Sequence, residues 1–140
     1  MGIKQGLLAI GLGLLAGCAD VNYSETAAQL AADELTGYWQ SVGPQSELLS
    51  PDAQASLAIM PDGTTFECRQ WQRVIAVQGK LTHNSSRSRW KNITEKQGQY
   101  GLALRDGKLR YAGMTMQQVS TLTPECAEAL LAVAAAKPAP

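Results

Sequence analysis

Residues 102–111 read Leu-Ala-Leu-Arg-Asp-Gly-Lys-Leu-Arg-Tyr, and this stretch predicts a β-hairpin. Asp106-Gly107 favours a two-residue turn with positive φ, whose twist suits a pair of antiparallel strands. The register pairs the apolar side chains across the hairpin: Leu104 with Leu109, and Leu102 with Tyr111. The opposite face is basic: Arg105, Lys108 and Arg110. One apolar and one polar face indicate an antiparallel sheet with water on one side.

Residues 57–68 contain a second Asp-Gly pair between two apolar runs, and they predict a second hairpin. A two-residue turn at Asp62-Gly63 places four apolar side chains on one face: Leu57, Ile59, Phe66 and Cys68. Ala58 and Glu67 then lie on the opposite face. We therefore expect Cys68 to point into the core and Glu67 to point away from it.

The rest of the chain supplies further strands and one helix. Strands are expected at residues 37–42, 73–81, 88–94 and 114–119, which makes about eight in all. Thr123-Pro124-Glu125 predicts a helix start, and Cys126, Leu130 and Val133 follow on one face. The predicted fold class is mainly β: a small antiparallel barrel or curved sheet with one C-terminal helix.

The first residues predict export and lipidation. Lys4 precedes an uncharged apolar run at residues 6–19, which is shorter than the roughly 20 residues that span a bilayer. The run ends in Leu15-Ala16-Gly17-Cys18, which resembles the bacterial lipoprotein cleavage box, in which the Cys is diacylated and becomes the first mature residue. Residues 1–17 are thus expected to be a signal peptide that is removed. Cys18 is expected to carry the lipid that anchors the protein to a membrane.

The remaining boundaries follow from composition. Residues 18–34 are expected to form a lipidated tether, residues 35–133 a single β-rich domain with its helix, and residues 134–140 a flexible tail. Ala19, rather than Asp, follows Cys18, which in enteric bacteria favours the outer membrane, facing the periplasm. Asp20 keeps the inner membrane as the alternative.

The composition argues against nucleic acid binding and against catalysis. Twelve Lys and Arg balance twelve Asp and Glu, so no basic excess is available for nucleic acid. The single histidine, His83, lies in a predicted loop, no serine lies in a Gly-x-Ser-x-Gly turn, and no pair of acids stands out. No metal-ligand spacing is present. We expect no enzymatic activity, no catalytic residue, no metal and no cofactor.

Cys68 and Cys126 are expected to form a disulfide. With Cys18 lipidated, they are the two remaining thiols of a chain exported to an oxidising compartment. Hairpin register and helix periodicity point both of them inward. The alternative is a pair of free buried thiols.

Arg69, Trp71 and Arg73 form the candidate contact surface. If Cys68 points inward, strand alternation sends these side chains outward together with Glu67. Arginines beside an exposed Trp can stack on its ring and bind carboxylate or phosphate. Either a bulge near Gln70–Gln72 swaps the faces, or the strand runs past the mouth of the barrel. The alternative is structural, with both arginines paired to acids and Trp71 covering the barrel.

Several segments resemble the YedD lipoprotein family of enteric bacteria. They are residues 37–40, 43–45, 50–51, 68–77, 79–81, 113–116 and 125–127. The resemblance implies a small lipoprotein of the cell envelope. Gly37-Tyr38-Trp39 is also similar to the Gly-x-Trp opening of lipocalins, in which the Trp closes the base of the barrel, and this resemblance implies that the small barrel or curved sheet is lipocalin-like.

The function that these features favour is a non-enzymatic binding module anchored in the envelope. Its partner would be an unknown envelope protein or a small ligand inside the barrel. Two alternatives remain: a structural or stress-related component without a pocket, and a protein binder similar to the lysozyme inhibitors, which are also small lipid-anchored barrels with one disulfide.

Overall fold

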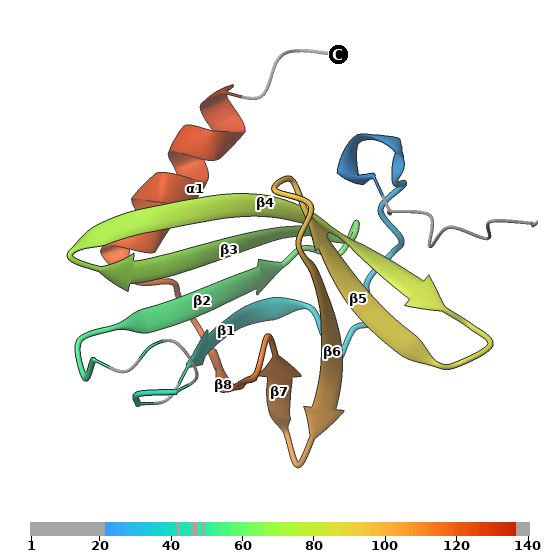
Figure 1. The fold of residues 1–140 in the computed structure, drawn as a ribbon, viewed down its shortest axis with the longest axis horizontal. Helices are drawn as coiled ribbons and strands as arrows, with labels where there is room; N and C mark the ends of the chain where they lie inside the picture. The colour runs from blue at the N-terminus through green and yellow to red at the C-terminus, as the bar shows by residue number, and fades with distance from the viewer. Residues whose placement is uncertain (1–21, 42, 46–47, 49, 137–140) are drawn as a thin grey trace, which may run out of the picture.

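The computed structural model describes residues 22–41, 43–45, 48 and 50–136. A short 3-10 helix, η1 (Tyr23–Glu25), precedes eight strands and one α-helix (Figure 1). The strands are β1 (Gly37–Ser41), β2 (Gln54–Ile59), β3 (Thr64–Trp71), β4 (Arg73–Asn84), β5 (Arg89–Thr94), β6 (Gln99–Arg105), β7 (Lys108–Tyr111) and β8 (Met114–Val119). The helix is α1 (Pro124–Ala136).

The eight strands close into an antiparallel barrel, which confirms the predicted fold class. Each strand pairs with the next, and β8 pairs with β1, with Trp39 opposite Gln118. Closure leaves the sheet without free edges. Side chains that alternate inward fill the interior with one apolar cluster, built around Trp39, Leu57, Leu81 and Met116.

The β6–β7 hairpin has the predicted register, with Leu104 opposite Leu109 and Leu102 opposite Tyr111. Asp106 has φ 53° and Gly107 has φ 74°, as a two-residue turn requires. The dipeptide therefore determines this hairpin locally.

The expected register of the β2–β3 hairpin is wrong by one residue. Ala58, rather than Ile59, lies opposite Phe66, and Leu57 lies opposite Glu67. The turn also includes Pro61: the Gly63 N–H donates to the Met60 carbonyl, and the Thr64 carbonyl accepts from the Met60 N–H. Proline fixes the φ that the first position of such a turn needs, so the loop gains a residue.

This shift exchanges the two faces of β3. Leu57 and Ile59 remain in the barrel interior, and Glu67 joins them there. Phe66 and Cys68 instead lie on the outer surface of the barrel, in a second apolar cluster. They are buried because a helix covers them.

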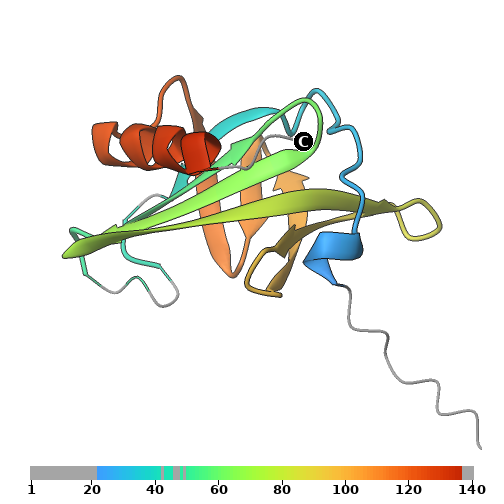
Figure 2. The ribbon, with the colours of Figure 1, turned by 90° about the horizontal axis from the view of Figure 1, so that it is seen from above.

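That helix is α1, which packs on the outside of β3 and β4 (Figure 2). Its predicted start is confirmed: Thr123 precedes Pro124, and its hydroxyl accepts a hydrogen bond from the Cys126 N–H at 3.3 Å. The same hydroxyl donates to the Gln70 side chain at 2.6 Å, which ties the helix start to β3. Cys126 is bonded to Cys68 in the expected disulfide.

The chain reverses direction at Gln72, which has φ 58°, and Trp71 lies opposite Arg73. The register of β4 with β5 begins at Gly79, and the backbone of Gln78 still bonds to Glu95, so residues 73–77 have no register partner in β5. The β3–β4 hairpin therefore extends beyond the barrel wall, as Figure 1 shows. The sequence allowed either a bulge near Gln70–Gln72 or a strand that runs past the mouth of the barrel, and the structure has the second arrangement.

The described part of the predicted tether lies on the barrel. The Gln29 N–H donates to the Leu81 carbonyl at 2.9 Å, and the Ala31 N–H donates to the Pro61 carbonyl at 3.1 Å. The Lys80 ammonium donates to the Tyr23 carbonyl and lies 4.3 Å from the centre of its ring. Residues 22–34 thus form an outer layer that covers this side of the barrel.

We expect Gly63→Ala to destabilise the protein and to release this layer. Gly63 has φ +89°, and a Cβ there would lie 1.9 Å from the Gln29 carbonyl oxygen. The strained backbone and the clash together should cost about 2 kcal/mol in the free energy of unfolding. Urea denaturation would measure the loss, and limited proteolysis would detect cleavage within residues 22–34. Gly107→Ala is the control: its Cβ would meet nothing within 4 Å, so it carries only the backbone strain. Equal losses in both variants, without new cleavage, would contradict the docking of this segment.

The predicted signal peptide at residues 1–17, the predicted lipidation site Cys18, Val42 and residues 137–140 lie outside the described residues. Among the helices that are described, none is long and apolar enough to cross a membrane.

Candidate functional site at the barrel mouth

One end of the barrel is closed by apolar packing around Trp39. Its indole N–H donates to the Leu35 carbonyl at 2.9 Å, and the residue is only 2% exposed. Leu35 itself is buried in the same cluster, so the chain entering β1 covers this end. The Gly-x-Trp sequence thus acts here as it does in the lipocalins that it resembles.

The other end, which we call the mouth, carries the β3–β4, β5–β6 and β7–β8 turns. A cavity of about 280 Å³ opens there. Its lining is part apolar and part charged: Leu48, Glu67, Arg69, Ile75, Val77, Lys96, Tyr100, Ala112 and Met114. Pockets for drug-sized ligands begin at roughly 300 Å³, so this one suits a small molecule or one side chain of a partner.

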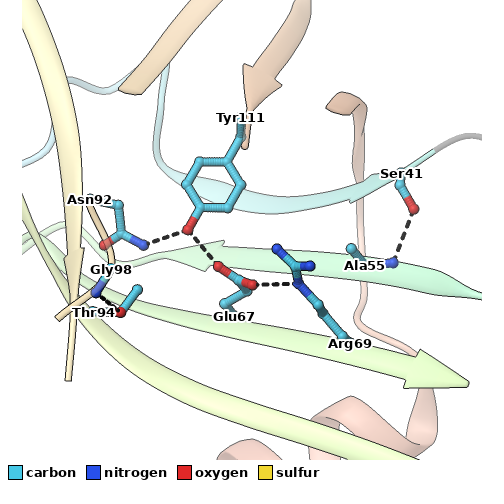
Figure 3. A network of polar contacts seen from close by, with 8 residues as sticks. All are labelled: Ser41, Ala55, Glu67, Arg69, Asn92, Thr94, Gly98 and Tyr111. Carbon is cyan, nitrogen blue, oxygen red and sulfur yellow. Dashed lines mark hydrogen bonds and ion pairs between the residues drawn. The ribbon is translucent and has the colours of Figure 1, made fainter. Parts of the chain in front are cut away.

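A network of polar side chains forms the floor of the mouth (Figure 3). The Tyr111 hydroxyl donates to Glu67 Oε2 at 2.5 Å and accepts from Asn92 Nδ2 at 2.9 Å. Asn92 Oδ1 accepts from the Thr65 hydroxyl at 2.6 Å, and Arg69 Nε donates to Glu67 Oε1 at 2.7 Å. Three strands, β3, β5 and β7, meet at this network, which satisfies its buried polar atoms.

The charges of this network neutralise each other. Burial raises the pKa of the Tyr111 hydroxyl, and the Glu67 carboxylate raises it further, so Tyr111 stays protonated. Burial acts to lower the pKa of Arg69, but Glu67 outweighs this effect and the pKa lies above its usual value. A paired carboxylate and a permanently protonated tyrosine are suited to holding the mouth rigid, rather than to transferring protons.

The structure divides the predicted contact surface. Arg69 is partly buried and paired with Glu67 in the mouth. Trp71 and Arg73 are both exposed and lie opposite each other at the tip of the β3–β4 hairpin. The expectation that Glu67 and Arg69 point away from the barrel is wrong, because the added turn residue Pro61 reverses the faces of β3.

The tip of this hairpin exposes large apolar side chains. Trp71 is 55% exposed, Val74 40% and Ile75 38%. Ile75 also lines the cavity, so the exposed surface is continuous with the mouth. Sequence reasoning found Trp71 and Arg73 but not Val74 and Ile75, whose exposure depends on β5 stopping short of them.

His83 lies at the end of β4 and not in the predicted loop. Its ring stacks on Trp90 of β5, with centroids 4.5 Å apart. This cross-strand contact extends the strand pair by three residues beyond Leu81. Within the described ranges, no group of three or more His, Cys, Asp or Glu side chains is arranged to hold a metal ion.

A closed antiparallel barrel with eight strands, one end sealed at a Gly-x-Trp strand and the other open, defines a lipocalin-like protein. Residues 20–130 match the model of a family described as "Bacterial lipocalin LPS transport optimiser YedD". The chain belongs to the YedD family, as its sequence motifs indicated.

Known relatives agree with this assignment. The uncharacterized lipoprotein YedD of Salmonella typhimurium (strain LT2) is 50% identical over 118 residues, which cover 84% of this chain and 82% of the relative. The Escherichia coli (strain K12) lipoprotein of the same name is 47% identical over 129 residues, 91% of this chain and 93% of the relative. The crystal structure of lipoprotein YedD from Klebsiella pneumoniae superposes with a TM-score of 0.78 at 40% identity, covering 85% of this chain and all of that one. The protein is accordingly a lipoprotein of the cell envelope.

Proposed function

We propose that this protein is a non-enzymatic binding module that Cys18 anchors by lipid to the outer membrane, facing the periplasm. Its partner docks on the exposed hairpin tip beside the mouth. The family's description as an LPS transport optimiser supports a partner among the proteins that transport LPS. The observation that carries the proposal is the exposed apolar surface of Trp71, Val74 and Ile75, continuous with a cavity.

The composition of the tip is that of an interaction site. Tryptophan and arginine dominate the binding energy of protein interfaces, and Trp71 and Arg73 are cross-strand neighbours here. The hairpin leaves the barrel wall, so a partner can reach the face that carries Trp71 and Ile75, whereas α1 packs on the opposite face. The cavity beside it has room for one partner side chain, which would pack against Ile75 and meet the charges of Arg69 and Lys96.

We expect Trp71→Ala with Arg73→Gln to abolish partner binding without loss of stability. Both side chains are exposed, so the free energy of unfolding should change by less than about 0.5 kcal/mol. Truncating such an anchor residue typically weakens binding by more than 2 kcal/mol, about 30-fold. The measurement is photo-crosslinking in cells from a photoreactive amino acid in place of Val74, with the captured protein identified by mass spectrometry.

Arg87→Gln is the matched control, because Arg87 is an exposed arginine in the turn at the other end of β4. It should leave crosslinking unchanged. Arg69→Gln separates the two roles expected of the arginines, binding a partner and stabilising the fold: it should lower stability, since it removes the cation that pairs with Glu67. Crosslinking that persists in the Trp71→Ala, Arg73→Gln variant would rule out the hairpin tip as the docking site.

A further inference from the structure

The outer surface of strands β5, β6 and β7 is basic. The side chains of these strands that point away from the interior include five exposed cations: Arg89, Lys91, Arg105, Lys108 and Arg110. None of the three strands contains an acidic residue. We call these five side chains the basic face.

The charge of the chain is strongly asymmetric around this face. Residues 87–110 contain seven Lys and Arg and two Asp and Glu, a net charge of +5, although the whole chain is neutral. The rest of the chain therefore carries −5. The basic face makes no ion pair with any residue in the described part of the chain. The Arg69–Glu67 pair lies in the mouth of the barrel and not on this face.

The basic face is also exposed, and no helix covers it. Ala103 lies opposite Arg110 on one side, and Gly101 lies opposite Lys91 on the other, so small exposed residues separate the cations of β5 and β7. With strands about 4.8 Å apart, those cations are spaced by roughly 10 Å. Helix α1 covers β3 and β4 instead (Figures 1 and 2).

The first described residues lie against the β5–β6 turn, at the mouth end of the strands that carry this face. The Tyr23 N–H donates to the side chain of Gln97, in the turn that joins β5 to β6, at 3.4 Å. Cys18 precedes Tyr23 by five residues, which span at most about 18 Å. A lipid on Cys18 would therefore hold the β5–β6 turn within about 18 Å of the membrane surface.

We propose that the basic face rests on the anionic phospholipid headgroups of the membrane that holds the anchor. This inference rests on the lipidation of Cys18 proposed above. Lipid chains supply attachment, and each Lys or Arg near an anionic surface adds about 1 kcal/mol, which restricts rotation about the anchor. Arginine forks suit the phosphate groups of such headgroups.

A membrane is favoured over an acidic protein partner by the position of the anchor. The five residues from Cys18 to Tyr23 keep the β5–β6 turn, at one end of the strands that carry the basic face, close to the lipid surface, whereas the acidic residues of a partner would need a separate docking site. The headgroups also form an extended surface, which matches cations spread over three strands.

The test is lipid crosslinking of the full-length lipoprotein, reconstituted in phosphatidylethanolamine vesicles with or without phosphatidylglycerol. A photoreactive amino acid replaces Ala103, between the cations, or in the control Leu131, which is 71% exposed on α1. We expect lipid adducts from position 103 in vesicles with phosphatidylglycerol, at least about five-fold fewer without it. Raising the salt from about 0.1 M to about 1 M should reduce them likewise, since the screening length falls from about 10 Å to about 3 Å.

Variants then identify the groups responsible. Arg89→Gln with Arg110→Gln should lower the adducts at position 103 as strongly, and Arg89→Lys with Arg110→Lys should preserve them. Flotation of the protein with the vesicles reports on the anchor separately: a protein that does not float overturns the lipidation of Cys18. A protein that floats but forms no more lipid adducts at position 103 than at position 131 overturns the basic face alone. Crosslinking of position 103 to a protein instead of to lipid, when the experiment is done in cells, would also overturn the proposed role of the basic face.

Discussion

Replacing both Cys68 and Cys126 with alanine is expected to lower the free energy of unfolding by about 4 kcal/mol. The disulfide joins residues 58 positions apart, and closing a loop of that length restricts the unfolded chain by about this amount. For a domain of this size the melting temperature should fall by about 20 °C. Thermal and urea denaturation of the oxidised protein and the double variant would measure the loss.

The loss should be concentrated in α1. Cys126 is the one buried residue of the helix. Among the described elements, α1 packs mainly against β3 and β4. Hydrogen exchange in the double variant should therefore accelerate in residues 124–136 before it accelerates in the barrel. Leu131→Ala, on the exposed side of the helix, is the control and should change little. A loss below about 1 kcal/mol, or uniform exchange, would contradict this account.

Tyr111→Phe is expected to cost about 3 kcal/mol in the free energy of unfolding. The change removes the hydroxyl that donates to Glu67 and accepts from Asn92, and it leaves two buried polar atoms without that partner. Each such atom costs about 1–3 kcal/mol. Tyr100→Phe is the matched control, because the Tyr100 hydroxyl bonds to no described residue although its ring packs edge-on against Tyr111.

The same residue should make stability depend on alkaline pH. The folded-state pKa of Tyr111 is raised above its unfolded value of about 10, so its contribution is fully present below pH 10 and is lost as the pH rises above it. The slope is about 1.4 kcal/mol per pH unit. Urea midpoints between about pH 9 and pH 11 should show this decline in the wild type and a smaller one in Tyr111→Phe. Identical declines would show that the tyrosine is not held protonated.

The sequence by itself determined the features that depend on neighbouring residues. Asp106-Gly107 sets the β6–β7 register, because two residues with positive φ admit one hairpin geometry. Thr123-Pro124 sets the start of α1, because the cap satisfies free backbone donors locally. The family motifs led to the assignment of the YedD family for the same reason, because each motif is a short run of consecutive residues.

Only the tertiary structure decided which face of β3 lines the barrel. Pro61 adds one residue to a turn, and with a side-chain period of two that single residue moves Glu67 to the interior and Cys68 to the exterior. Apolar pattern alone could not show this, because α1 buries the outer face of β3 as fully as the barrel buries its inner face. One of the two partners of Glu67, Tyr111, is 44 residues away in the sequence, and contacts at that range arise only once the barrel closes.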